Sequence, residues 1–480
     1  MGAGRSWQFI LAIIMAAEVL SSLESMMAIA ALSAWIRIYN DVVGVGWIVT
    51  SYMLVAAAAA AICGRLGDLY GRKRVLLWVI SAAIFGSVVS ACAPTLEIVI
   101  AGRAIQGLSG AIIPLCYGLV REHLPQDRVP FGIGMIIATA SLSAAAGLLI
   151  GGYLTDHYNP QSIFVASAVF GVLIFGVVAA CLPGSSGRGS RTGPIDWLGG
   201  TLFVPGLTLI LLVIGNLTRW GLASAQPLLM LGAGIAILAW WIVHERRHPD
   251  PLIDVSLLSD RDALLANLVM GCTAIGAMQT TQLVSMLLQQ PIWTGAGIGT
   301  SASYVGVLKL PAILLGAACS VLAGIASGKL GGRVPIIFGT IVMTAGALLG
   351  MADINSLPVM FIAVALSTIG VTAVFTGVPN VIVAVTPASR TSEAAGMMSV
   401  FRAVFQAAGA QLLVIILASA TIAGKDGIRY PDASAYMLAF GLMAGVSIAG
   451  LLLAICLGGR KLGSEESAAD APGPAEPLKV

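Results

Sequence analysis

Long apolar runs, separated by short polar or charged segments, form the dominant pattern along this chain. A membrane-spanning helix needs about 20 apolar residues, whereas the strands of a transmembrane barrel alternate polar and apolar residues over shorter segments. The runs are continuous and show no such alternation, so they predict an all-α integral membrane protein with fourteen transmembrane helices. The predicted spans lie near residues 7–34, 43–63, 75–94, 97–120, 130–153, 161–182, 196–215, 226–243, 263–288, 303–327, 334–352, 358–382, 394–420 and 436–457.

Two polar segments divide the predicted spans into groups of six, two and six. The first, 183–194, is rich in glycine and serine, and the second, 244–262, is the longest charged loop. Two groups of six spans suggest two pseudo-equivalent halves around a central cavity. The predicted units are an N-terminal six-helix bundle (1–182), a linker with two extra transmembrane helices (183–262), a C-terminal six-helix bundle (263–457) and a disordered cytoplasmic tail (458–480).

The composition excludes several classes of protein. The chain of 480 residues is 58% apolar and only 10% charged, whereas a soluble domain carries about 25% charged residues. An ordinary soluble enzyme and a disordered protein are therefore excluded. The net charge of +3, without a basic patch among aromatic residues, argues against a nucleic-acid partner. We also expect no metal and no cofactor, because the seven cysteines lie within apolar runs without a CxxC pair and no phosphate-binding loop is present.

Lysine and arginine residues are distributed unevenly between the two sides of the predicted membrane. With a cytoplasmic N-terminus, 18 of the 25 fall in segments on the inside, and three lie within spans. Only four remain on the outside, namely Arg37, Arg219, Lys425 and Arg429. Loops rich in lysine and arginine stay in the cytoplasm. The bias and the even number of spans together predict that both termini are cytoplasmic.

The loop after the second span contains a dense set of glycine and charged residues, from Gly64 to Leu76. Gly64 and Gly71 permit a tight hairpin between two closely packed helices. Asp68 can accept hydrogen bonds from the N-terminus of a neighbouring helix, while Arg72 and Lys73 hold the cytoplasmic side. Taken alone, the residues fit a solvated positive loop equally well.

The same residues match every fixed position of the cytoplasmic signature of the major facilitator superfamily, G-x-L-x-D-x-x-G-R-K-x-x-L. Further segments resemble the 14-helix drug:proton antiporters of that superfamily; these are Leu23-Glu24 to Leu32, Arg103 to Gly107, Asp196-Trp197, Arg247 to Asp254 and Gly396 to Arg402. The resemblance implies a major facilitator fold, and a transporter rather than an enzyme. It also implies export of small amphiphilic, drug-like compounds in exchange for protons.

By the same resemblance, Gly64, Asp68, Gly71, Arg72 and Lys73 form a cytoplasmic gate. The expected partners are a small-molecule substrate, protons and the lipid bilayer, and we expect a multi-pass monomer in the cell membrane, inner or plasma, of a bacterium. One departure keeps an alternative open. The fifth span carries glycines at 147, 151 and 152, but Leu148 stands where these antiporters have proline. A proton-coupled importer of a small organic solute on the same fold therefore remains an alternative.

Charged residues inside spans are the first candidates for function. Glu18 and Glu24 are the only acidic residues near the middle of a span, and with Ser21, Ser22 and Ser25 they occupy an arc of about 160°. We expect this polar side to face the central cavity. Because a low dielectric disfavours a charged carboxylate, Glu24 or Glu18 can carry the coupled proton. Arg103 in the fourth span would modulate proton binding by approaching the carboxyl group and moving away from it.

Uncharged polar residues in the second half are candidates for binding the substrate. In the ninth span, an arc of about 100° contains Gln279, Gln282, Met286, Gln289 and Gln290. Amides and a thioether bind varied amphiphiles, although hydrogen bonding between helices explains the same amides equally well. Three further residues complete the predicted substrate site: Gln106, Asn380 and Lys309, the last of which either meets substrate or extends to the membrane surface.

Overall fold

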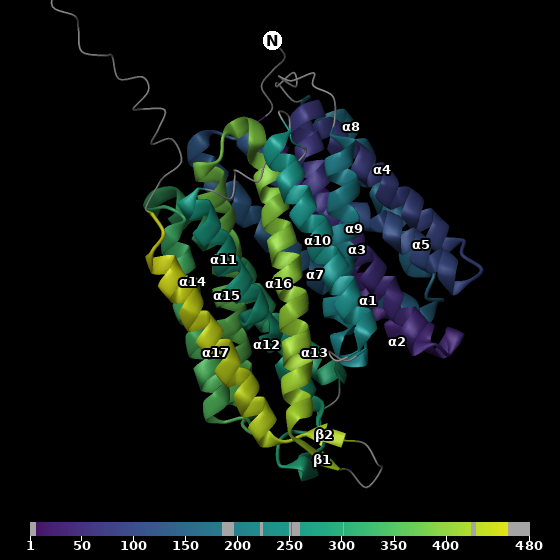
Figure 1. The fold of residues 1–480 in the computed structure, drawn as a ribbon, viewed down its shortest axis with the longest axis vertical. Helices are drawn as coiled ribbons and strands as arrows, with labels where there is room; N and C mark the ends of the chain where they lie inside the picture. The colour runs from purple at the N-terminus through teal and green to yellow at the C-terminus, as the bar shows by residue number, and fades with distance from the viewer. Residues whose placement is uncertain are drawn as a thin grey trace, which may run out of the picture.

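The computed structural model describes residues 6–184, 196–220, 224–248, 251, 260–300, 302–423 and 429–458 (Figure 1). The N-terminal half comprises α1 (Trp7–Ala30), α2 (Leu32–Tyr39), α3 (Val42–Tyr70), α4 (Arg72–Ala91), α5 (Leu96–Gln106), η1 (Gly107–Ala111), α6 (Ile112–His123), η2 (Gln126–Arg128), α7 (Val129–His157) and α8 (Ser162–Cys181). Two further helices follow, α9 (Trp197–Trp220) and α10 (Ala225–Arg247).

The C-terminal half comprises α11 (Arg261–Ile275), η4 (Ala277–Gln279), α12 (Thr280–Gln289), η5 (Ile292–Thr294), α13 (Ala302–Leu330), α14 (Arg333–Ala352), α15 (Leu357–Val385), η6 (Ala388–Arg390), α16 (Thr391–Ser419), β1 (Thr421–Ala423), β2 (Arg429–Pro431) and α17 (Ala433–Ile455). The predicted tail from residue 459 onward, and most of the predicted polar segments 183–194 and 244–262, lie outside the described residues.

Fourteen helical segments of the described chain are long and apolar enough to cross a membrane, which confirms the predicted number. Their bounds differ from the predicted runs by a few residues. The pattern missed two elements, the short helix α2 and the antiparallel pair β1–β2, in which Thr421 lies opposite Pro431. Each strand has three residues, which is too short for an alternation of polar and apolar residues to be recognised.

Two spans are interrupted near their middle. In the fourth, the 3₁₀ segment η1 separates α5 from α6, and in the ninth, Gly276 and η4 separate α11 from α12. Gly276 has φ −94° and ψ −95°, which no α-helix contains. Because a short 3₁₀ stretch inside a helix changes which side chains share a face, these two breaks determine how the polar residues of both spans are placed.

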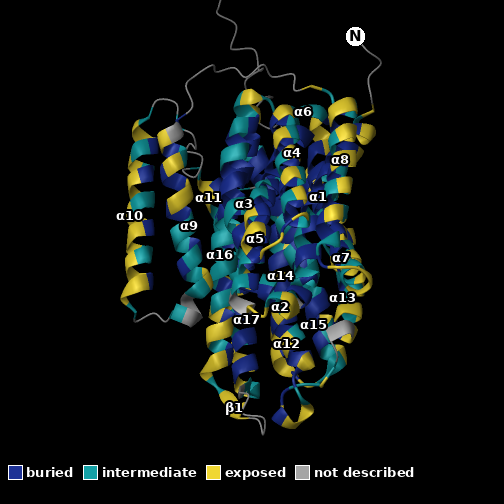
Figure 2. Cartoon of the chain, turned by 90° about the vertical axis from the view of Figure 1, so that its right-hand side faces the viewer, coloured by how far each residue is buried: buried dark blue, intermediate teal, exposed yellow. Residues whose placement is uncertain are grey.

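The helices form one elongated bundle with two distinct ends (Figure 1). We call the end at which α1 begins and α17 ends the terminal end, and the end that carries β1 and β2 the hairpin end. The two extra helices lie on one side, where α9 packs against α3 and α16 (Figure 2). Asp196 stabilises this pair, since it accepts a hydrogen bond from the Gly199 N–H (2.9 Å) and contacts His244 of α10 at 2.8 Å.

Candidate functional site

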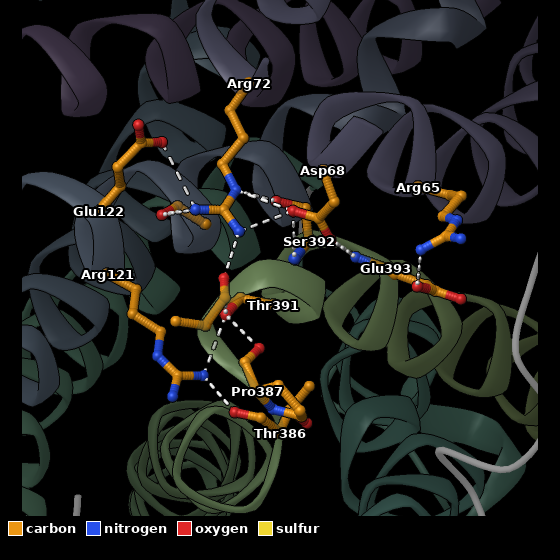
Figure 3. Close-up of polar contacts among 12 residues, drawn as sticks. Arg65, Asp68, Arg72, Arg121, Glu122, Thr386, Pro387, Thr391, Ser392 and Glu393 are labelled. Carbon is orange, nitrogen blue, oxygen red and sulfur yellow. Dashed lines mark hydrogen bonds and ion pairs between the residues drawn. The ribbon is translucent and has the colours of Figure 1, made fainter. Parts of the chain in front are cut away.

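Asp68 is the centre of a buried polar cluster at the terminal end (Figure 3). It occupies the last turn of α3, and Gly71 (φ 97°) turns the chain into α4. Arg72, at the start of α4, therefore comes back to Asp68, with Nε 2.8 Å and Nη2 2.7 Å from the same carboxylate oxygen. Both side chains are almost completely buried, so the pair does not behave as a solvated loop.

The carboxylate of Asp68 also binds the N-terminus of α16, a helix of the opposite half. The Glu393 N–H donates to Oδ2 (2.9 Å) and the Ser392 N–H donates to Oδ1 (3.4 Å). N–H groups in the first turn of a helix lack partners within the helix, and the helix dipole favours a negative charge there. The contact agrees with the role predicted for Asp68, and it links the two halves.

Arg72 extends the same link toward the residues that precede α16. Its Nη2 donates to the carbonyl oxygen of Ala388 (2.6 Å), and its Nη1 donates to that of Gly118 (3.1 Å). Its Nε also lies 3.0 Å from the Ser392 hydroxyl, and Glu122 lies 3.5 Å from Nη1. Lys73, by contrast, donates to the carbonyl oxygens of Ala179 in the last turn of α8 and of Leu182 just after it, both in the N-terminal half.

Two flanking arginines reinforce the connection between the halves (Figure 3). Arg65 forms a buried ion pair with Glu393 at 3.0 Å. Arg121 donates to the carbonyl oxygen of Thr386 (2.5 Å) and to the Thr391 hydroxyl (3.0 Å). Sequence reasoning assigned neither arginine to a site and did not single out Glu393. An acidic residue in the first turn of a helix was visible, but its partner lies more than 300 positions away.

Glycines let the helices of the two halves approach closely at this end. A Cβ at Gly64 would overlap the carbonyl oxygen of Ser392, and one at Gly396 would overlap that of Ala60. On the other side of the bundle, Gly134 of α7 meets the backbone of α13 at Gly324. The polar cluster and these crossings close the terminal end of the bundle.

The turn at Gly71 offers a direct test of this geometry. Because φ is 97°, Gly71→Ala should lower the free energy of unfolding by about 1–3 kcal/mol, seen as a lower thermal midpoint in detergent. Gly46→Ala is the matched control, since Gly46 lies at a negative φ with open space around its Cβ position. An equal effect of both substitutions would contradict the role of the left-handed turn.

A second buried polar network surrounds Glu24 in α1. Glu24 is 2% exposed, and its Oε1 accepts a hydrogen bond from the Ser109 hydroxyl (2.5 Å). The Tyr52 hydroxyl lies 3.0 Å from the same Ser109 oxygen. The second oxygen of Glu24 has no hydrogen-bond partner among the residues that the structure describes. An unpaired buried carboxylate is costly in a medium of low dielectric, so this oxygen is positioned to take up a proton.

Arg103 reaches this network indirectly. Its guanidinium lies 4.3 Å from the centre of the Tyr52 ring, and it donates to the Ile48 carbonyl (3.2 Å) and the Gln106 side chain (2.9 Å). Among the described residues, Arg103 forms no ion pair with Glu24; Tyr52 and Ser109 connect them instead. Gln106 serves this network by donating to Ser87 (2.5 Å), so its amide holds Arg103 in place.

The break in the fourth span explains why Ser109 lies at Glu24. Ser109 belongs to η1, and a Cβ at Gly107 or Gly110 would meet the backbone of α3 at 2.7 Å. The two glycines therefore let η1 lie directly against α3. Sequence reasoning missed Ser109, because its position depends on this 3₁₀ segment.

Glu18, which precedes Glu24 by six residues in α1, is enclosed by protein. It is fully buried, and its Oε1 accepts a hydrogen bond from the Ser22 hydroxyl (2.7 Å), while its Oε2 has no partner within the described ranges. Arg402 of α16 attracts Glu18 electrostatically from the opposite half, with its guanidinium 5.7 Å from the centre of the Phe375 ring. Glu18, Ser21 and Glu24 of this polar side are buried in this conformation, whereas Ser22 and Ser25 are partly exposed.

The predicted arc of amides in the ninth span forms only in part. Gln279 lies in η4, and Gln290 lies beyond the end of α12 with extended backbone. Gln279 is buried and donates to the carbonyl oxygens of Ala274 and Gln406 (2.9 and 3.2 Å). Gln290 is also buried and binds the hairpin end through Pro431 and Tyr436. Both amides hold helices and strands together.

The other predicted substrate residues have different surroundings. Asn380 is buried and donates to the Thr376 carbonyl one turn earlier (2.8 Å). Gln282 and Gln289 of α12 are exposed, as is Met286 (40%). Lys309 of α13 is partly buried and contacts α12.

Comparisons with known proteins agree with this architecture. The family model of the Major Facilitator Superfamily matches residues 14–410. The chain is similar to the Multidrug resistance protein Stp of Mycobacterium tuberculosis (28% identity, 78% of this chain and 69% of that protein). It is also similar to the Tetracenomycin C resistance and export protein of Streptomyces glaucescens (24% identity, 89% and 78%).

The structure shares its fold with a solved transporter. The proton:xylose symporter XylE aligns with a TM-score of 0.65 over 96% of this chain and 98% of that one, at 12% identity. Members of the matched family are membrane transporters that move small molecules, and they are not enzymes. A family model that matches most of the chain establishes the family, and the fourteen candidate spans agree with it. The chain belongs to the major facilitator superfamily of multi-pass membrane transporters.

Proposed function

We propose that this protein is a proton-coupled exporter of small amphiphilic, drug-like compounds that works by alternating access. We further propose that it acts as a monomer in the bacterial cell membrane, inner or plasma, with both termini in the cytoplasm. Two similar proteins are named for multidrug resistance and for resistance and export, which supports export of foreign or self-made compounds. The excess of lysine and arginine at the terminal end supports the orientation.

The observation that carries the proposal is the Glu24 network. In the second half of α1, a buried carboxyl group has one oxygen bound by Ser109 and the other unpaired among the described residues. Protonation removes its charge, and the altered hydrogen bond to Ser109 reaches Tyr52 and, through the ring, Arg103. These residues belong to α1, α3, η1 and α5, so one proton influences how four elements of the N-terminal half pack.

The closed terminal end supplies the second element of the mechanism. With the termini in the cytoplasm, the Asp68 cluster seals the cytoplasmic side, and the protein faces outward. Proton uptake at Glu24 from the outside would then be followed by separation of Asp68 and Arg72 from α16. Release of the proton to the cytoplasm, as substrate binds, would return the protein to the closed state. The gradient of protons thereby drives export.

Import on the same fold remains the alternative, because Leu148 stands where the antiporters that this chain resembles have proline. The glycines of that segment still allow close packing, since Gly147 lies against Leu23 and Gly151 against Met27 of α1. Leu148 itself is 43% exposed. The contact between α7 and α1 therefore does not depend on position 148, which favours export as the first hypothesis.

The orientation has its own test. Reporter proteins that are active only in the cytoplasm, fused separately to the N-terminus and the C-terminus, should both be active. A periplasmic signal from either fusion would contradict the orientation and the pairing of the Asp68 cluster with the cytoplasmic side.

Transport in proteoliposomes tests the function itself. Purified protein is reconstituted, a pH difference is imposed, and a panel of cationic, neutral and anionic amphiphilic dyes is followed. Antiport predicts that substrate moves against the direction of proton flow, whereas the importer predicts movement in the same direction. Movement that is unaffected by collapse of the pH difference would refute proton coupling.

A further inference from the structure

Lys309 is a positive charge placed within an otherwise apolar span. It lies seven residues after the first residue of α13, which is about 10 Å along the helix axis. Its ammonium group donates to the Thr281 carbonyl oxygen (3.1 Å) and to the Ser285 hydroxyl, both on α12. Lys309 therefore reaches across to the neighbouring helix instead of extending to the membrane surface at the hairpin end.

The part of α12 beside Lys309 presents polar groups on its exposed face. Gln282 and Gln289 are exposed there, with Ser285 between them and Met286 adjacent. The opposite face of α12, formed by Leu283, Val284, Leu287 and Leu288, is buried in the apolar core of the C-terminal half. The Gln289 amide donates to the Ser285 carbonyl oxygen (2.9 Å), but the other polar atoms of these two exposed side chains would lack hydrogen bonds against lipid, so this face borders water. Because the terminal end is closed, that water enters from the hairpin end.

The charge of Lys309 has no anionic counterpart in the described part of the chain. Among the residues that the structure describes, no carboxylate lies within ion-pair distance of its ammonium group, and its two partners are neutral oxygens. A partly desolvated cation that lacks an anion is unfavourable, and a bound anion with charge-assisted hydrogen bonds would compensate for it. The charge therefore selects for a ligand that brings a negative group.

We propose that Lys309, Ser285 and Gln282 form a subsite for the anionic group of an amphiphilic substrate. The carboxylate or sulfonate of the ligand would bind the ammonium group and the neighbouring hydroxyl and amide donors, and its apolar part would contact Met286. The inference rests on the proposed transport function and specifies its substrate class as amphiphilic acids.

A matched pair of probes tests this subsite. 1-Anilinonaphthalene-8-sulfonate and N-phenyl-1-naphthylamine share an aromatic skeleton and differ by one sulfonate group. In proteoliposomes under a pH difference, Lys309→Met should raise the KM for the sulfonate by about tenfold or more, as the loss of a charge-assisted hydrogen bond predicts. The KM for the neutral amine should change little, and Lys309→Arg should retain most of the preference.

Lys329→Met is the control, because Lys329 is an exposed lysine at the other end of the same helix. Equal losses for both probes in Lys309→Met, with the thermal midpoint lowered, would show a structural role and overturn the subsite. If the wild-type protein transports the amine but not the sulfonate, the subsite alone is overturned. If the wild-type protein transports neither probe, the result contradicts the proposed function as well.

An anionic lipid headgroup carries the same chemistry as the substrate acid. Vesicles of phosphatidylcholine with and without phosphatidylglycerol distinguish the two sources. The subsite predicts that Lys309→Met changes the preference for the sulfonate equally in both lipids. If the variant instead alters only the dependence on phosphatidylglycerol, Lys309 holds lipid, and the substrate assignment is wrong.

Discussion

Replacing Asp68 with asparagine should lower the turnover of transport by about an order of magnitude or more while leaving the protein folded and inserted. The substitution removes the charge that holds Arg72 and the N-terminus of α16. Loss of one partner from a buried ion pair costs about 3–5 kcal/mol. Glu122 lies 3.5 Å from the same guanidinium and retains part of this attraction.

The closed conformation should therefore be destabilised by about 2 kcal/mol, which shifts the equilibrium between closed and open states about thirtyfold. Substrate affinity should change less than turnover, because Asp68 lies at the terminal end, far from the proposed binding subsite. Hydrogen exchange offers a local readout. The amides of Ser392 and Glu393 should exchange faster in Asp68→Asn, since both donate to this carboxylate.

Asp127→Asn is the matched control for this experiment. Asp127 lies near the same end of the bundle, but its ion pair with Arg128 is exposed, and exposed pairs contribute about 0–1 kcal/mol. We expect Asp127→Asn to transport substrate like the wild type and to show the same hydrogen exchange at the amides of Ser392 and Glu393. Wild-type turnover together with unchanged exchange at Ser392 and Glu393 in Asp68→Asn would contradict the role of Asp68 in closing the terminal end.

The second large effect is expected at Glu24. Glu24→Gln keeps the size of the side chain and an oxygen for the Ser109 hydroxyl, but the amide cannot carry the coupled proton. Accumulation driven by a pH difference should fall to the level of protein-free vesicles. Exchange of labelled for unlabelled substrate at equal concentrations should persist, because it requires no net proton movement.

Two further variants assign the proton to one carboxyl group. Glu24→Asp should retain part of the pH-driven transport, since it keeps the acid but shortens its reach to Ser109. Glu18→Gln should retain coupling, because Glu18 bonds within its own helix and does not contact Ser109 or Tyr52. If Glu18→Gln abolishes pH-driven accumulation and Glu24→Gln retains it, Glu18 carries the proton instead.

The sequence pattern predicted the number of spans because transmembrane helices are long and apolar whatever surrounds them. The loop residues allowed Asp68 to bind a helix N-terminus, but taken alone they fitted a solvated positive loop equally well. The pattern could not identify Glu393 and Ser392 as the partners of Asp68, because the contact depends on how two halves meet. Likewise, the link from Glu24 to Arg103 depends on Ser109 and on where η1 lies.

The amides show the opposite case, in which a regular helix was assumed and the chain departs from it. Gln279 and Gln290 share an arc with Gln282 only if the ninth span is continuous. After Gly276 the chain forms η4, which contains Gln279, and Gln290 lies beyond the end of α12 with extended backbone. Both amides are buried in the protein. A single glycine within an apolar run gives no signal that separates a break from close packing.

Proton release on substrate binding tests the role of Glu24 most directly. Purified protein in weakly buffered detergent solution is mixed with the best-transported compound of the dye panel, and a pH indicator records the protons released. Exchange of substrate for a proton at Glu24 predicts release from the wild type and from Glu18→Gln, and none from Glu24→Gln. Release from Glu24→Gln equal to that of the wild type would contradict the assignment of the coupled proton to Glu24.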